Sequence, residues 1–160
     1  MKNKYLILSL VTAVVISLDQ ATKLFIDRTM EIHSSLTVVN NFFNITYIRN
    51  KGAAFGFLAD TSFRLPFFIG ISIIAVVVII GILRNIRSEQ KLTVVALSLI
   101  LSGALGNLID RVRLGEVIDF IDCHWYQHHW PAFNVADSAI CVGVFILATD
   151  MFLEERRRKS

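Results

Sequence analysis

The stretch from Pro66 to Leu83 decides the class of this protein. It reads PFFIGISIIAVVVIIGIL and contains no charged residue. The hydrocarbon core of a bilayer is about 30 Å thick, and roughly 20 mostly apolar residues cross it as an α-helix. This stretch therefore predicts a transmembrane helix, and the rest of the chain can be interpreted around it.

Three other segments are similarly apolar, so four spans are predicted: residues 5–26, 66–83, 92–109 and 135–153. Thr61 or Ser62 and Asn134 are candidate N-caps for the second and fourth spans. Hydrophobic residues make up 54% of the 160 residues and charged residues only 18%, whereas soluble domains carry about 25% charged residues. This composition excludes a soluble globular domain and a disordered chain.

Lysine and arginine predict the topology. Nine of the sixteen basic residues precede the first span, separate the second from the third, or follow the fourth: Lys2, Lys4, Arg84, Arg87, Lys91, Arg156, Arg157, Arg158 and Lys159. Basic loops stay on the cytoplasmic side, so both termini are expected there. The net charge of +3 then reflects topology and does not indicate nucleic-acid binding. An uncleaved anchor is favoured over a cleaved signal peptide, because no small-residue cleavage site follows the first span.

The two outward segments, residues 27–65 and 110–134, contain strand patterns. Residues 36–39, 42–48 and 117–121 are β-branched or alternate in polarity, which predicts a small sheet at the membrane surface. Gly52 and Gly56 bracket an expected turn. An interfacial aromatic belt is indicated by Trp125, Tyr126, Trp130 and Phe133. We expect one domain spanning residues 1–160, an all-α membrane protein whose four-helix bundle carries a small extracytoplasmic β-sheet.

Some polar residues lie within or next to the spans. A charged side chain near the bilayer centre costs roughly 2.5–3.5 kcal/mol on insertion scales, so such residues are candidates for function. Asp19 and Lys23 are four apart and can pair on one helix face, as a structural ion pair or as part of a site. Asn107 and Arg111 share a face at the outer end of the third span, beside small residues at 103, 104 and 106. A close helix interface with a polar end would also explain that pattern.

Asp119 and Asp137 carry the more specific signal. Asp119 lies in an apolar strand pattern and could be a solvated residue, whereas Asp137 opens the fourth span and could interact with the helix dipole. Both are predicted at the depth of Asp19, Asn107 and Arg111. Two adjacent carboxylates cannot both ionise cheaply, and the pair titrates as a unit. One carboxylate can then activate water while the other protonates a peptide carbonyl, as in aspartic proteases.

A metal site is a competing interpretation of the second outward segment. His124 and His128 are four apart and would share a face if the segment were helical, with Cys123 and His129 beside them. The segment contains no His-Glu-x-x-His motif, so a metal is not favoured. Cys141 is expected to be a buried small residue, and no disulfide is proposed.

Five ordered motifs resemble the lipoprotein signal peptidases, the bacterial type II signal peptidases. They are DQATK at 19–23, NKGAAFG at 50–56, GALGNLIDR at 103–111, VIDFI at 117–121 and FNVADSA at 133–139. Ser102 stands where many members have a second glycine. The resemblance implies an aspartic endopeptidase of the bacterial cytoplasmic membrane. Such enzymes cleave diacylglyceryl-modified prolipoproteins on the N-terminal side of the lipidated cysteine, on the extracytoplasmic side, and globomycin inhibits them.

The resemblance also implies roles for individual residues. Asp119 and Asp137 match the catalytic dyad. The family's supporting polar residues match Asp19, Lys23, Asn50, Asn107, Arg111 and Asn134. The sheet and a short amphipathic segment would form a cradle and a lid, with no metal or cofactor, in a monomer within the lipid bilayer. Two alternatives remain from the residues themselves. One is a small transporter or channel with Asp19, Lys23 and Asp137 lining a polar path, and the other is a non-enzymatic scaffold.

Overall fold

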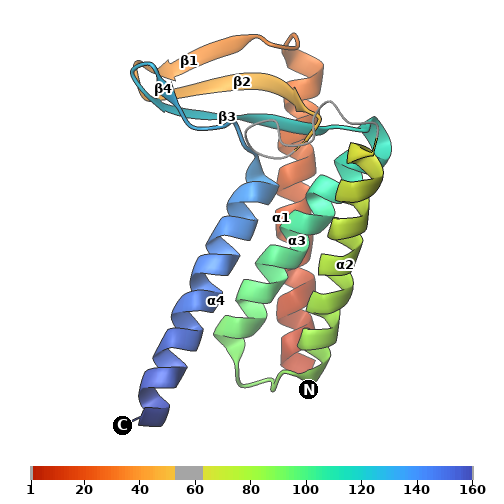
Figure 1. Ribbon diagram of the computed structural model, residues 1–160, viewed down its shortest axis with the longest axis vertical. Coiled ribbons are helices and arrows are strands. Elements are labelled where there is room, and N and C mark those ends of the chain that lie inside the picture. The colour runs from red at the N-terminus through yellow and green to blue at the C-terminus, as the bar shows by residue number, and fades with distance from the viewer. Residues whose placement is uncertain (1, 53–62, 160) are drawn as a thin grey trace.

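The computed structural model describes residues 2–52 and 63–159 (Figure 1). Four helices and four strands follow one another as α1 (Lys2–Thr29), β1 (Ser35–Val39), β2 (Phe43–Asn50), α2 (Arg64–Asn85), α3 (Lys91–Leu114), β3 (Val117–Trp125), β4 (His128–His129) and α4 (Val135–Lys159). All four helices are long and apolar enough to cross a membrane. The prediction of four long apolar helices is therefore confirmed. The helix α3 continues to Leu114, beyond the predicted end at 109, so Asn107 and Arg111 share a helix face as expected.

The helix α3 is the centre of the bundle, because it packs against each of the other three helices. Small residues allow α3 and α4 to approach closely. A side chain at Gly103 would overlap the carbonyl oxygen of Ala136, and a Cβ atom at Gly143 would lie 2.7 Å from the carbonyl oxygen of Ala96. The predicted close helix interface at residues 103–106 is therefore present.

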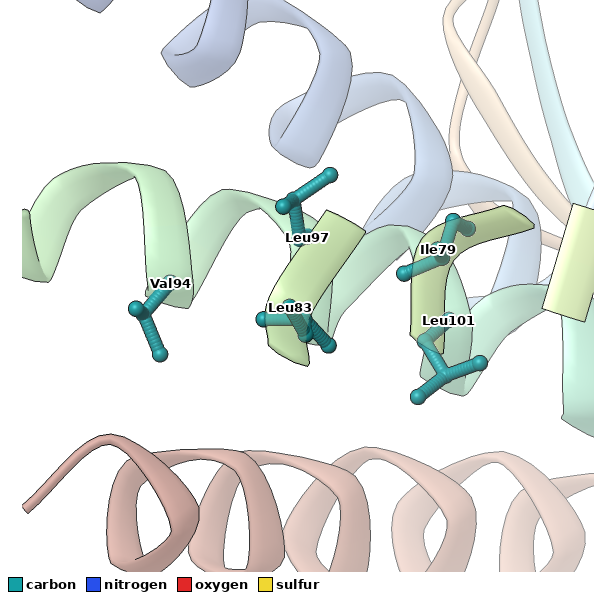
Figure 2. Packing of buried hydrophobic residues seen from close by; sticks show 5 residues of the cluster. All are labelled: Ile79, Leu83, Val94, Leu97 and Leu101. Carbon is teal, nitrogen blue, oxygen red and sulfur yellow. The ribbon is translucent and has the colours of Figure 1, made fainter. Parts of the chain in front are cut away.

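Apolar side chains fill the interior and also cover the outside of the bundle. A buried cluster joins α2 to α3 (Figure 2), made of Ile79, Leu83, Val94, Leu97 and Leu101. Large apolar side chains such as Ile74, Val77 and Phe145 are exposed on the outer helix faces. A soluble protein does not present apolar surface on this scale, whereas a lipid-facing bundle does.

The strands form one antiparallel sheet in the order β1-β2-β3-β4. The sheet covers one end of the bundle, and both chain ends lie at the opposite end (Figure 1). A second buried cluster of Ile26, Tyr47, Ile118 and Phe120 fixes the sheet to the end of α1. Gly115, with φ of 73°, ends α3 and lets the chain turn directly into β3. The three predicted strands are confirmed, and each extends beyond its predicted range.

Some local predictions need correction. Phe63 holds the N-cap position of α2, so the assignment of that cap to Thr61 or Ser62, which lie outside the described residues, is wrong. The turn expected at residues 53–56 also lies outside them. The sequence did not indicate that Lys4 is buried, with its Nζ donating to three carbonyl oxygens at the end of α2, 2.8–3.0 Å away. These carbonyls lack partners within the helix, and Lys4 satisfies them.

Candidate active site

Asp119 and Asp137 lie at the junction of the sheet and the helices, and amide groups hold both carboxylates. The Asn134 and Asn50 side chains each donate to one oxygen of Asp119 at 2.8 Å. The Asn107 side chain donates to Asp137 Oδ1 at 2.8 Å, and Asn134 Nδ2 also lies 3.2 Å from Asn107 Oδ1. A continuous chain of hydrogen bonds therefore joins the two acids. Amide groups do not titrate, so they orient the carboxylates without competing for a proton.

The start of α4 fixes Asp137. Asn134 accepts a hydrogen bond from the backbone N–H of Asp137 at 2.9 Å, and Asp137 accepts one from the backbone N–H of Asn134 at 3.2 Å. This is the reciprocal arrangement of a capping box, and it confirms Asn134 as the N-cap. The acid at the third helical position is thus aimed back toward β3, where Asp119 lies.

A buried ionic cluster supports the two acids from the side of α1. Lys23 Nζ lies 2.9 Å from Asp19 Oδ2 and 2.9 Å from Asp110 Oδ2, and it donates to Asn107 Oδ1 at 3.0 Å. Asp19 in turn accepts from the backbone N–H of Ala136 at 2.9 Å. The predicted pairing of Asp19 with Lys23 is therefore present, and it joins α1 to α3 and to the first turn of α4.

Two residues of this cluster were missed by the sequence analysis. Asp110 is only 1% exposed, and one of its oxygens accepts the backbone N–H of Ile118 at 3.3 Å. The Gln20 amide nitrogen lies 3.1 Å from oxygens of both Asp19 and Asp110. The spacing of residues 103, 106, 107 and 110 on α3 marks one helix face, and that pattern could have identified Asp110.

A cavity of about 590 Å³ opens onto the two acids. Asp119 lines this cavity and is only 2% exposed, so it is no solvated strand residue. The cavity is also lined by Asn50, Asn107 and Arg111. One of its walls is formed by Trp130, Pro131, Ala132 and Phe133. The Arg111 guanidinium lies 5.0 Å from the ring centre of Phe68. Arg111 lines the cavity, and within residues 2–52 and 63–159 no hydrogen bond joins it to either acid.

Burial raises the pKa of Asp119 to about 7, and the charge of Asp137 acts in the same direction. The hydrogen bonds from Asn50 and Asn134 act in the opposite direction. Near neutral pH Asp119 therefore holds a proton for much of the time. A carboxyl group with a pKa near the working pH suits general acid catalysis.

The second outward segment folds as the hairpin β3–β4 and not as a helix, so His124 and His128 do not share a helix face. His124 lies opposite His129 across the hairpin. The prediction that Cys141 in α4 is buried is wrong. Cys141 is exposed and lines the cavity. Cys123 and Cys141 are both free thiols, in agreement with the absence of a proposed disulfide.

Comparison with known proteins gives a consistent result. The family model described as signal peptidase II matches residues 11–153. Two curated proteins named lipoprotein signal peptidase are similar over their whole length. The one from Geobacter metallireducens is 60% identical, covering 100% of this chain and 99% of that protein. The one from Geobacter sulfurreducens is 61% identical and covers 99% of each.

The fold matches a solved structure as well. A protein described as a bacterial membrane enzyme superposes with a TM-score of 0.84 at 37% identity, covering 96% of this chain and 91% of that one. The resemblance seen in the five sequence motifs is therefore confirmed, and this chain belongs to the signal peptidase II family.

Proposed function

We propose that this chain is an aspartic endopeptidase that removes the signal peptide of diacylglyceryl-modified prolipoproteins. Cleavage falls on the N-terminal side of the lipidated cysteine. The observation that carries the proposal is the hydrogen-bonded chain from Asp119 through Asn134 and Asn107 to Asp137, because both acids line one cavity. Membership in the signal peptidase II family supports it.

The two acids have different surroundings and take different roles. Asp137 lies in the first turn of α4, where the helix dipole and a backbone N–H donor stabilise its anion. Asp119 lies on the strand β3, where burial raises its pKa to about 7. Asp137 accepts a proton from water as the water oxygen attacks the scissile carbonyl carbon, and Asp119 donates its proton to the carbonyl oxygen. The C–N bond then breaks, the leaving amine takes the proton from Asp137, and Asp119 recovers its own from the new acid.

The remaining site residues position the acids or the substrate. Asn50, Asn107 and Asn134 orient the carboxylates, while Asp19 and Lys23 hold α1 against that arrangement. Arg111 binds carbonyl oxygens of the substrate from the cavity wall. No metal or organic cofactor takes part in the reaction. A globomycin-type cyclic peptide inhibits by filling the same cavity.

The location of the site suits a substrate held in a membrane. Asp137 is in the first turn of α4 and Asn107 is near the end of α3, so the acids lie at the interface, where water reaches them. The protein acts as a monomer in the bacterial cytoplasmic membrane. Both termini are cytoplasmic and the sheet is extracytoplasmic.

The proposal is tested with purified protein in lipid and a synthetic prolipoprotein peptide, prepared with and without diacylglycerol on its cysteine. Mass spectrometry locates the cut. We expect cleavage directly before the modified cysteine and little cleavage of the unmodified peptide. Cleavage at another bond, or equal cleavage of both peptides, contradicts the proposal.

A further inference from the structure

A second cluster of ligating side chains lies on the hairpin β3–β4, apart from the two acids of the cavity. Asp122, His124 and His129 have donor atoms that all lie within 4.8 Å of one another. His129 Nδ1 is 2.8 Å from Asp122 Oδ1, and His124 Nδ1 is 3.9 Å from Asp122 Oδ2. The proposed reaction uses none of these three residues.

Strand geometry brings the three side chains together. Asp122 and His124 are two residues apart on β3 and so point to one face of the sheet. His129 lies opposite His124 on β4, and the two imidazole rings are stacked with centres 4.5 Å apart. Asn44 lies opposite Asp122 on β2, and its Nδ2 donates to Asp122 Oδ2 at 2.9 Å.

Two atoms of this cluster are buried without a hydrogen-bond partner. They are His124 Nδ1 and Asn44 Oδ1, and within residues 2–52 and 63–159 no other buried side-chain nitrogen or oxygen lacks a partner. The His124 side chain is only 7% exposed. Burying a polar atom without a partner is costly, so two such atoms in one cluster favour a ligand that both could contact. An unpaired imidazole nitrogen aimed at a carboxylate is suited to a cation that both can bind.

We propose that Asp122, His124 and His129 bind a zinc ion. Two imidazoles and a carboxylate form a ligand set that zinc takes in proteins, with bonds of about 2.0–2.2 Å. In tetrahedral geometry such bonds place neighbouring donor atoms about 3.4 Å apart. His129 lies 2.8 Å from one Asp122 oxygen and His124 lies 3.9 Å from the other. One donor atom from each residue lies within 4.8 Å of the other two, so side-chain rotations that draw the three donors together complete the site.

The surroundings supply the other requirements of a metal site. The Asn44 amide already orients the Asp122 carboxylate, as partners of metal ligands commonly do. Asn44 Oδ1 is available for the fourth position or for a water held there. The His129 side chain is 50% exposed, which gives the ion a route from solvent.

The ion would fasten the two-residue strand β4 to β3. Trp130, Pro131 and Ala132 follow β4 directly and form one wall of the cavity. Short hairpins are marginally stable by themselves, so zinc would stabilise this wall without joining the reaction. Binding at this site does not depend on the proposed function.

Zinc binding is measured on the purified full chain in detergent, by elemental analysis after loading and by competition with a chromophoric chelator. We expect about one zinc per chain for the wild type. The double variant His124→Gln/His129→Gln should bind at least about tenfold more weakly. The matched control is His33→Gln/His128→Gln, which changes the two other histidines, both exposed, and should bind like the wild type.

Equal zinc affinity of the two double variants, or no binding by the wild type, would overturn the proposal. Circular dichroism and gel filtration check that the variants fold. If the double variant does not fold, His129→Gln alone replaces it, since that side chain is half exposed. Hydrogen exchange gives a second readout. Zinc should slow exchange across residues 122–130 in the wild type and in the control, and not in the cluster variant.

Discussion

Replacing Lys23 with methionine tests whether charge holds the buried cluster together. The ammonium group lies 2.9 Å from Asp19 Oδ2 and 2.9 Å from Asp110 Oδ2, and Lys23 is only 2% exposed. Methionine keeps much of the length and apolar volume of lysine but removes the charge. Two buried carboxylates would then face each other without a cation.

Removing one partner of a buried ion pair costs about 3–5 kcal/mol, because the charge left behind is uncompensated. A chain of this size shifts its unfolding temperature by about 2–4 °C per kcal/mol. Lys23→Met should therefore lower the unfolding temperature by roughly 6–20 °C.

Tryptophan fluorescence during heating in detergent measures this change. The matched control is Lys51→Met, because Lys51 is 56% exposed and lies 3.9 Å from Glu116. An exposed pair is worth less than about 1 kcal/mol. The double variant Lys23→Met/Asp110→Asn should recover part of the loss, since one of the two unpaired charges is gone. An unfolding temperature of Lys23→Met equal to that of Lys51→Met would refute the reasoning.

Three further changes test other parts of the structure. Gly103→Ala should cost about 1–3 kcal/mol, because the added methyl overlaps the Ala136 carbonyl and forces α3 from α4, and thermal unfolding measures it. The raised pKa of Asp119 means that the folded state binds the proton more tightly, so stability should fall by up to about 4 kcal/mol as pH rises from about 4 to about 7. Unfolding temperatures measured across this pH range should fall as the pH rises. An equal fall in Asp119→Asn would contradict the assignment of the raised pKa to Asp119. Tyr47→Phe removes the hydroxyl that donates to Asp27 and should cost about 1 kcal/mol in denaturant unfolding, whereas an unchanged midpoint would show that bond to be dispensable.

Local patterns were enough to predict the helices and strands. Hydropathy over about 20 residues identifies a span, and alternation identifies a strand, without reference to any distant part of the chain. The pairing of Asp19 with Lys23 was also predictable, because residues four apart share a helix face.

The remaining parts of the site depend on packing between elements. The spacing on α3 places Asp110 on the same helix face as Asn107, but its ion pair with Lys23 depends on how α3 packs against α1. His124 lies opposite His129 because this segment is a hairpin. The spacing of the histidines was also compatible with a helix, so it did not predict which two would lie together. Cys141 looked like a buried small residue, but α4 turns it toward the cavity. The sequence predicted Asp119 and Asp137 at one depth in the membrane. The hydrogen bonds through Asn134 and Asn107 that join them depend on the tertiary fold.

The central claim is that Asp119 and Asp137 carry out peptide hydrolysis together. The most direct measurement is single-turnover cleavage of the diacylglyceryl-modified peptide by Asp119→Asn and Asp137→Asn, each shown to be folded by its unfolding transition. Glu31→Gln is the control, since Glu31 is exposed outside the cavity. We predict that each variant loses at least about 100-fold in rate and that the control retains the wild-type rate. Loss of general acid–base catalysis slows a reaction by much more than about twofold. If either folded variant cleaves within about twofold of the wild-type rate, the assignment of Asp119 and Asp137 as the catalytic dyad is wrong.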